Sequence, residues 1–317
     1  MSGVIPAMAS EPTPVDVPPV ADELVASGAW QRMGDYLELT KPRIAVLVLF
    51  TVMAGGVIAD GGRADVRLLV HAVIGTALVA CGASILNQVN ERHSDALMNR
   101  TARRPIPTGR VAPTEGAILG YGAAVVGTVY LVLLVNLLSA AVALASFILY
   151  VFIYTPMKRV TALNTVIGAI PGAFPPLVGW AAVRGSFSID ALWLFLLVFF
   201  WQFPHFFAIA WLYRDDYARA GLRMLPTTRL GRRMTGWQMV SFCLVLFPVT
   251  LAPVMTSSAG RILLVGSIIL GLQFLGFCLA FLMQPSRIRA KYVLWSSLVY
   301  LPMMLILWML DSMKGAS

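Results

Sequence analysis

Residues 67–95 read RLLVHAVIGTALVACGASILNQVNERHSD, an apolar run that ends in a cluster of polar and charged side chains. Its apolar part, residues 67–89, is long enough to cross the hydrocarbon core of a bilayer, which takes about 20 residues of helix. At its polar end, Asn87, Glu91 and Asp95 are four residues apart, so in a helix they lie on one stripe. The segment therefore predicts a transmembrane helix with three oxygen donors at one end.

The rest of the chain repeats this apolar pattern. Of its 317 residues, 58% are hydrophobic and 12% are charged, whereas soluble domains have about 45–50% and about 25%. This composition excludes a water-soluble globule and predicts an all-α, polytopic membrane protein. The apolar runs between charged or Pro/Gly-rich breaks predict nine transmembrane helices, at residues 44–60, 67–89, 117–136, 138–156, 162–183, 189–212, 237–257, 262–283 and 292–310.

The two ends of the chain differ from this pattern. Residues 1–34 are rich in Pro and Ala and lack the basic start and apolar stretch of a signal peptide, so we expect a disordered cytoplasmic tail. The transmembrane domain follows over residues 35–312, and residues 313–317 form a short C-terminal tail. The three cysteines stand singly in apolar runs, which favours simple packing.

The net charge of +9 is distributed unevenly. Nine spans place their connections alternately on two sides of the membrane, and 19 of the 24 Lys and Arg residues fall on one side. The other side has Arg63, Arg67, Arg184, Arg261 and Lys314. Because cytoplasmic loops carry the excess of bases, we expect a cytoplasmic N-terminus and a periplasmic C-terminus in a bacterial inner membrane, or the mitochondrial inner membrane in a eukaryote. A nucleic-acid partner is not needed to explain the charge.

The polar end of the second span has the composition of a metal and phosphate site. Amide and carboxylate oxygens are the ligands that Mg²⁺ prefers, and the ion often bridges to substrate phosphates. Arg100, Arg103 and Arg104 follow closely, and guanidinium groups neutralise phosphate oxygens. The alternative interpretation is a solvated helix end whose bases only orient the span.

A second cluster ends the sixth span, where residues 201–221 read WQFPHFFAIAWLYRDDYARAG. The adjacent carboxylates Asp215 and Asp216 could complete a second metal position, and Arg214 and Arg219 suit phosphate. A surface ion cluster is the alternative. Apart from the tail and its junction, the expected cytoplasmic side has five acids, and four of them lie in the two clusters. This concentration favours metal and phosphate binding.

Other residues could contribute to the same pocket. Lys41 and Arg43 precede the first span and Lys158 follows the fourth, although they also serve to orient these spans. His205 lies in an aromatic apolar span after a proline. It is either a hydrogen-bonded core histidine or a ligand for a metal-bearing substrate.

Several short motifs follow one another along residues 35–310. They are LTKPR at 39–43, the Asn87, Glu91 and Asp95 triplet, MNRTARRP at 98–105, YTPMKR at 154–159, Asn164 with Gly168, PPLVGW at 175–180, PHF at 204–206 and DYARAGLRMLP at 216–226. In this order they resemble the UbiA-type intramembrane prenyltransferase superfamily. Where the superfamily carries DxxxD at its second site, this chain has Tyr213 and Tyr217, with Asp215 and Asp216 between them; this agrees with the branch that modifies haem.

The resemblance implies a nine-helix bundle whose active site opens near the cytoplasmic face. It implies transfer of the farnesyl group of farnesyl diphosphate to a vinyl group of haem b, with addition of water, giving haem O and pyrophosphate. Haem A synthase or cytochrome oxidase assembly factors would be partners. The alternatives are a prenyltransferase acting on a quinone precursor or chlorophyllide and, less favoured, a transporter, which would place its ionisable residues near the bilayer midplane.

The resemblance also assigns roles to residues. Asn87, Glu91 and Asp95, with Asp215 and Asp216, would hold Mg²⁺, and Asp216 and Tyr217 would complete the catalytic group. His205 would contact haem. The diphosphate would be bound by Lys41, Arg43, Arg100, Arg103, Arg104, Lys158, Arg214 and Arg219.

Overall fold

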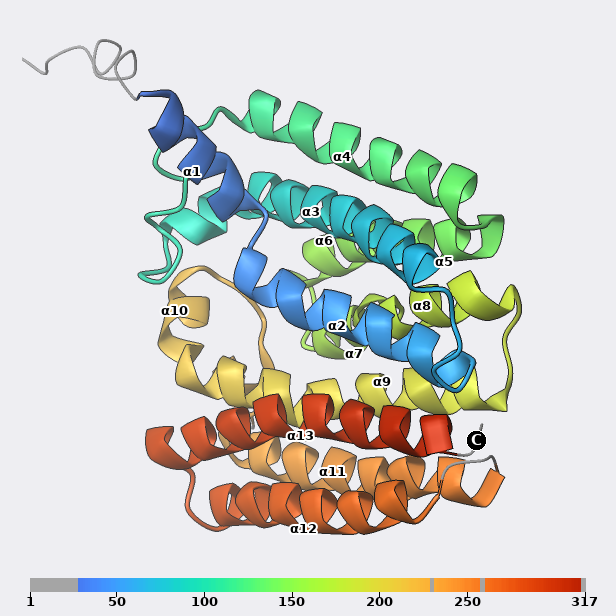
Figure 1. Cartoon of the computed structure of the whole chain (residues 1–317). Coiled ribbons are helices and arrows are strands. Elements are labelled where there is room, and N and C mark those ends of the chain that lie inside the picture. Colours follow the sequence, from blue (N-terminus) through green and yellow to red (C-terminus); the bar gives the residue numbers. More distant parts are fainter. Residues whose placement is uncertain (1–27, 229–230, 257–259, 315–317) are drawn as a thin grey trace, which may run out of the picture.

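Long helices that run side by side make up the computed structural model, which describes residues 28–228, 231–256 and 260–314 (Figure 1). Within these residues nine helical segments are long and apolar enough to cross a membrane, and there is no strand. The all-α prediction and the nine predicted spans are therefore confirmed. The segments are α2 (Pro42–Ala59), α3 (Val66–Ala96), α4 (Pro113–Leu134), Leu137–Met157, Asn164–Arg184, α9 (Ile189–Leu212), α11 (Gly231–Thr256), α12 (Arg261–Met283) and α13 (Arg287–Lys314).

The fourth span changes its winding part-way. It consists of α5 (Leu137–Ile148), a π-helical turn η2 (Leu149–Tyr154) and the short α6 (Thr155–Met157). Pro156 explains the change, because a proline in a helix has no N–H to donate and its ring clashes with the carbonyl one turn earlier. The wider π turn accommodates the ring, and the backbone N–H of Thr155 donates to the carbonyl of Tyr150.

The fifth span is broken in the middle of its length. It consists of α7 (Asn164–Gly172) and α8 (Pro175–Arg184), separated at Ala173 and Phe174 by the pair Pro175-Pro176. Gln202 of α9 lies against this break, and its Nε2 donates to the carbonyl oxygens of Ala169 and Val198, both at 3.1 Å. Gly172 leaves the space that the Gln202 side chain occupies. The sequence did not predict this interruption.

The N-terminal boundary differs from the expectation. The tail was expected to be disordered over residues 1–34, but helix α1 (Ala29–Leu39) already begins at Ala29. Residues 1–27 lie outside the described part of the chain, as do residues 315–317 of the expected C-terminal tail. Helix α1, the connection over residues 97–112 and helix α10 (Arg214–Arg219) lie at one end of the bundle, and the described C-terminus lies at the other (Figure 1). We call these the site end and the far end.

Glycines set the distance between two pairs of packed helices. At Gly55 and Gly179, an added Cβ would collide with the backbone carbonyls of Pro176 and Val52, so α2 and α8 touch backbone to backbone. At Gly82 of α3, it would meet the carbonyl of Gly120 of α4 at 2.5 Å. Small residues allow this close approach in membranes, where packing rather than the hydrophobic effect drives helix association.

We expect Gly179→Ala to lower stability by about 1–3 kcal/mol, because the added methyl group forces α2 and α8 apart. Gly122→Ala is the control, since a Cβ there meets nothing within 4 Å. Thermal unfolding of both variants in detergent micelles checks this. Equal melting temperatures for the two would show that the close contact does not constrain the pair.

Candidate active site

The three predicted oxygen donors lie on the buried stripe of α3, not in solvent. Asn87, Glu91 and Asp95 expose 2%, 7% and 1% of their surfaces. Helix α3 continues to Ala96, beyond the apolar run, and the chain packs around this polar end. The solvated-helix-end interpretation is therefore wrong for these side chains.

Each donor is held by a base from a different part of the chain. Lys41 Nζ donates to Asn87 Oδ1 at 2.8 Å. Lys158 Nζ lies 2.7 Å from Glu91 Oε1, and Arg104 donates from Nη1 to Asp95 Oδ2 at 2.7 Å. Buried carboxylates need such partners, because an unpaired charge away from water is costly. The structure thus brings together six of the predicted site residues.

Thr155, which directly follows the π turn, is a site residue that the sequence analysis missed. Asn87 Nδ2 donates to Thr155 Oγ1 at 3.3 Å, and Thr155 Oγ1 donates to the carbonyl of Tyr150 at 2.8 Å. Thr155 therefore fixes the orientation of the Asn87 amide. Single π turns are frequent at functional sites, and the proline after Thr155 was the signal for this one.

The bases at the site shift one another's protonation. Burial, together with the charges of Arg104 and Lys158, lowers the pKa of Lys41 to about 7. Burial is the largest single influence on Lys158 and opposes its charge, but the neighbouring groups, with the Glu91 carboxylate foremost, together outweigh it and raise the pKa of Lys158 above its usual value. Lys158 thus stays protonated at neutral pH, whereas Lys41, with a pKa of about 7, is only partly protonated there. Among the described residues, Lys41 is the only one other than glycine with a positive φ, at 52°.

Arg100 joins the second cluster to the first. It donates from Nη2 to the hydroxyl of Tyr217 at 2.7 Å, and its guanidinium carbon lies 4.9 Å from the ring centroids of both Tyr213 and Tyr217. Burial raises the pKa of Tyr217, so it stays a neutral phenol. Asp216 pairs with Arg219 on the same short helix, α10. The two clusters therefore form adjoining walls at the site end.

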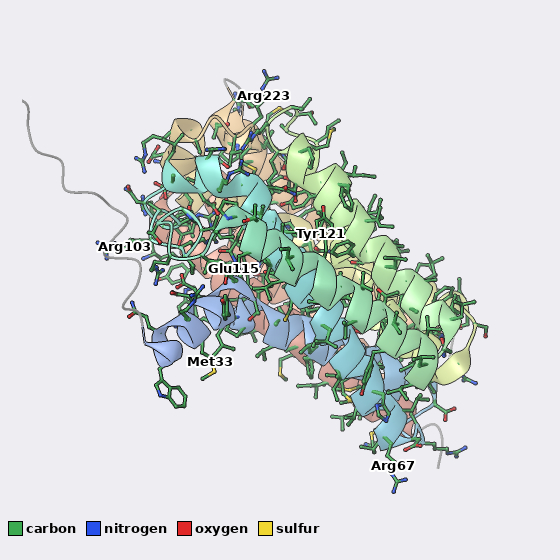
Figure 2. The ribbon with its side chains drawn as sticks, turned by 90° about the horizontal axis from the view of Figure 1, so that it is seen from above. Met33, Arg67, Arg103, Glu115, Tyr121 and Arg223 are labelled. Carbon is green, nitrogen blue, oxygen red and sulfur yellow. The ribbon has the colours of Figure 1, made fainter. Side chains whose placement is uncertain are left out.

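Other predicted residues stand apart from these walls. Arg43 and Arg103 are exposed, and Arg103 lies at the edge of the molecule (Figure 2). The side chain of Asp215 is 67% exposed and pairs with its neighbour Arg214 at 3.7 Å. The structure does not gather these four side chains around the α3 stripe, and their predicted roles stay predictions.

His205 lies between α9 and α13. Its Nδ1 is 2.8 Å from Ser297 Oγ, and its ring stacks on Trp201 with centroids 5.0 Å apart. The Ser297 hydroxyl donates its one hydrogen to the carbonyl of Leu294 at 2.6 Å, so it must accept from His205 Nδ1–H. A neutral His205 in this arrangement keeps the lone pair on Nε2.

An apolar cavity of about 200 Å³ begins at Lys41 and passes between α2, α3, α5 and the broken fifth span. Small side chains, among them Ala80, Ala83 and Ala143, line it, together with Phe147. Lys41 is the one charged group among the described residues that line it. The cavity suits an apolar chain whose anionic end meets Lys41.

The oxygen donors of α3 fit a hard metal ion. Asp95 Oδ1 is buried and has no hydrogen-bond partner, and a buried carboxylate oxygen with no partner is a position that a cation would satisfy. In the described part of the chain, no three His, Cys, Asp or Glu side chains form a metal site by themselves. A metal ion here would thus be shared with the amide of Asn87 and with oxygens of a bound ligand.

Comparison with known proteins identifies the family. The sequence profile of the UbiA prenyltransferase family matches residues 48–309. The chain belongs to the UbiA prenyltransferase family. Two relatives of this UbiA chain are both named protoheme IX farnesyltransferase. The protein of Solibacter usitatus is 42% identical over 288 residues, which cover 88% of this chain and 99% of the relative. The protein of Koribacter versatilis is 40% identical over 294 residues, which cover 90% and 95%.

Solved structures show the same UbiA fold. A digeranylgeranylglyceryl phosphate synthase superposes with a TM-score of 0.75 at 14% identity, covering 90% of this chain and 99% of that chain. A UbiA homologue from Aeropyrum pernix K1 has a TM-score of 0.67 at 16% identity, covering 82% and 97%. One from Archaeoglobus fulgidus, bound to GPP and Mg²⁺, has a TM-score of 0.60 at 14% identity, covering 88% and 99%.

We expect Lys158→Met to destabilise this UbiA chain by about 3–5 kcal/mol, because it leaves the buried Glu91 charge unpaired. The double variant Lys158→Met, Glu91→Gln should recover most of that loss, since no charge remains. Asp215→Asn removes the exposed partner of the pair with Arg214 and should cost at most about 1 kcal/mol. Denaturation in micelles measures all three, and a Lys158→Met variant as stable as Asp215→Asn would contradict the buried pair.

Proposed function

We propose that this protein transfers the farnesyl group of farnesyl diphosphate to a vinyl group of haem b, with addition of water, giving haem O and pyrophosphate. The observation that carries the proposal is the buried stripe of Asn87, Glu91 and Asp95, which is met by three bases. One of these bases, Lys41, also lines the apolar cavity. The names of relatives that align along most of the chain support the same reaction.

The basic groups would bind the diphosphate. Lys41, Arg104 and Lys158 surround the stripe, and Arg100 joins it to the second wall. As the bond between C1 of the farnesyl group and its oxygen breaks, negative charge develops on pyrophosphate, where fixed cations stabilise it. A Mg²⁺ ion held by Asn87, Glu91 and Asp95 would add positive charge at the same leaving group.

The cavity would hold the farnesyl chain and keep water from the allylic cation. The electron pair of the broken C–O bond leaves with pyrophosphate. The vinyl π electrons of haem b then form the new C–C bond, and the cation left on the former vinyl group takes hydroxide from water, which releases a proton. Small cavity residues such as Ala80 and Ala143 leave room for the chain.

His205 is suited to contact haem iron. Because its Nδ1–H is donated to Ser297, its Nε2 carries the lone pair that a metal ligand needs, and ligating histidines usually donate their other N–H in this way. This arrangement favours haem over a quinone precursor or chlorophyllide as the acceptor. A transporter is disfavoured, because the ionisable cluster lies at one end of the bundle.

The site end would face the cytoplasm, since 19 of the 24 bases fall on that side of the predicted spans. The N-terminus would then be cytoplasmic and the C-terminus periplasmic in an inner membrane. The product, haem O, would pass to haem A synthase or to cytochrome oxidase assembly.

We expect Asp95→Asn to reduce haem O formation by about 100-fold or more, because it removes charge that holds the metal ion without changing side-chain volume. Asp60→Asn, at the far end, should leave the yield unchanged. The assay measures the mass and the yield of the porphyrin product after incubation with haem b and farnesyl diphosphate. Chelation of divalent cations should stop the wild-type reaction and added Mg²⁺ should restore it.

Near-normal haem O from Asp95→Asn would show that the site is wrongly assigned. Pyrophosphate release with a small aromatic acceptor but never with haem b would favour the sister activity. Absence of pyrophosphate release when haem b is present would contradict the proposal that this protein is an enzyme.

We expect His205→Ala to weaken haem b binding by about tenfold, because the proposed ligand of the haem iron is lost. Titration of the haem absorption band measures this. His71→Ala is the matched control, since His71 also hydrogen-bonds through Nδ1, to Tyr130 at 2.7 Å, but in another part of the fold. Equal haem affinity of the two variants would exclude His205 as the contact.

A further inference from the structure

Helix α1 carries an apolar stripe that no described part of the chain covers. Trp30, Met33 and Leu37 expose 82%, 47% and 58% of their surfaces. Their spacing of three and four residues places them on one side of the helix. Met33 lies at the rim of the molecule in Figure 2, so the stripe faces away from the bundle.

Polar contacts fix the rotation of α1 about its axis. Asp35 Oδ1 accepts from Arg110 Nη1 at 2.6 Å, and Glu115 at the start of α4 accepts from Tyr36 and from Arg32. Leu39 is fully buried, and its carbonyl accepts from Gln88 Nε2 at 2.8 Å. The apolar stripe therefore cannot turn inward without breaking these bonds.

The stripe continues the lipid-facing surface of the bundle. Ile44 and Val46, in the first turns of the adjoining span α2, are 63% and 71% exposed. Helix α1 itself contacts the first turn of α4, so it lies at the level where the spans begin (Figure 1). Exposed Arg43 lies nearby in sequence and would meet lipid phosphate.

We propose that α1 is an interfacial helix that lies in the headgroup region of the bilayer, with Trp30, Met33 and Leu37 inserted toward the acyl chains, and that it thereby holds Lys41 in the site. Tryptophan is enriched at membrane interfaces, and an amphipathic helix binds there through its apolar face. Lipid thus covers the exposed side chains of the stripe.

The connection to the site is short. Helix α1 ends at Leu39, and only Thr40 separates it from Lys41, whose backbone is in the left-handed region. A non-glycine residue keeps such a conformation only when its surroundings impose it. Lipid on one side of α1 and the Arg110 and Glu115 contacts on the other impose it here.

Collision accessibility of spin labels tests the interfacial position directly. The full chain is reconstituted in bilayers of phosphatidylcholine and phosphatidylglycerol, with single labels at Met33→Cys, Leu37→Cys and Gln31→Cys. Native Cys243 and Cys278 are buried, and Cys81 is half-buried in α3; all three are replaced by alanine. Gln31 is exposed and is rotated by about 100° from Trp30 around the axis of α1, so it lies outside the stripe.

We expect labels at 33 and 37 to collide more with oxygen than with a water-soluble nickel chelate, and the label at 31 to show the reverse. Nickel collisions at 33 and 37 equal to those at 31 would overturn the proposal. Low collision rates with both reagents would also overturn it, because the stripe would then be covered by protein, such as residues 1–27 or a second copy of the chain.

The positioning of Lys41, which rests on the proposed function, needs a kinetic test. We expect Met33→Gln, Leu37→Gln to raise KM for farnesyl diphosphate by about tenfold, since small displacements of a binding group are costly. Gln31→Ala should leave it unchanged. An unchanged KM in the double variant would overturn the coupling to Lys41. Absence of farnesyl transfer by the wild type, with the collision pattern intact, would overturn only the proposed function.

Discussion

Two carboxylates and an amide are buried on one side of α3, and the site end is arranged around the basic groups that pair with them. Glu91 pairs with Lys158, Asp95 with Arg104, and Asn87 accepts from Lys41. These bases come from three separate segments, so burial of one helix end draws together the start of α2, the connection after α3 and the end of the fourth span. Because a lone charge there would be costly, the same requirement that stabilises the fold also concentrates the cations that a diphosphate needs.

The second wall is built on a different principle. Tyr213 and Tyr217 hold the guanidinium of Arg100 by ring contacts, and the Tyr217 hydroxyl also accepts a hydrogen bond from it. Asp216 is engaged by Arg219 and Asp215 is largely exposed. The two walls therefore differ in chemistry. The α3 wall presents oxygen donors paired with bases, whereas the wall at α10 binds the Arg100 cation between two aromatic rings.

Hydropathy was sufficient to predict the nine spans, because length and apolarity alone decide whether a helix can cross a bilayer. Spacing was sufficient for the α3 stripe, because residues four apart share a helix face. Sequence reasoning missed the π turn at Leu149–Tyr154, the break at Ala173 and the helical start at Ala29. Each depends on a proline or on contacts with distant residues, and hydropathy does not register either.

The partners within the site were equally hard to foresee. Thr155 reaches Asn87 across 68 positions, and Arg100 reaches Tyr217 across 117. Such pairs are set by how helices pack, so the sequence can supply candidate side chains without supplying their neighbours. His205 shows the same limit, since its hydrogen bond to Ser297 comes from a helix 92 positions away.

The broken fifth span gives the apolar cavity a rigid wall. Pro171, Gly172 and Pro175 line the cavity at the break, and Gln202 from α9 donates to the carbonyl of Ala169 in α7, beside the break. In hydrocarbon no water can replace a lost bond to such a group, so losing this bond would be costly. One amide thus holds α9 against the broken span that lines the cavity. If the cavity holds the farnesyl chain, as the proposed function has it, selection among prenyl chains would depend on their steric fit against this wall.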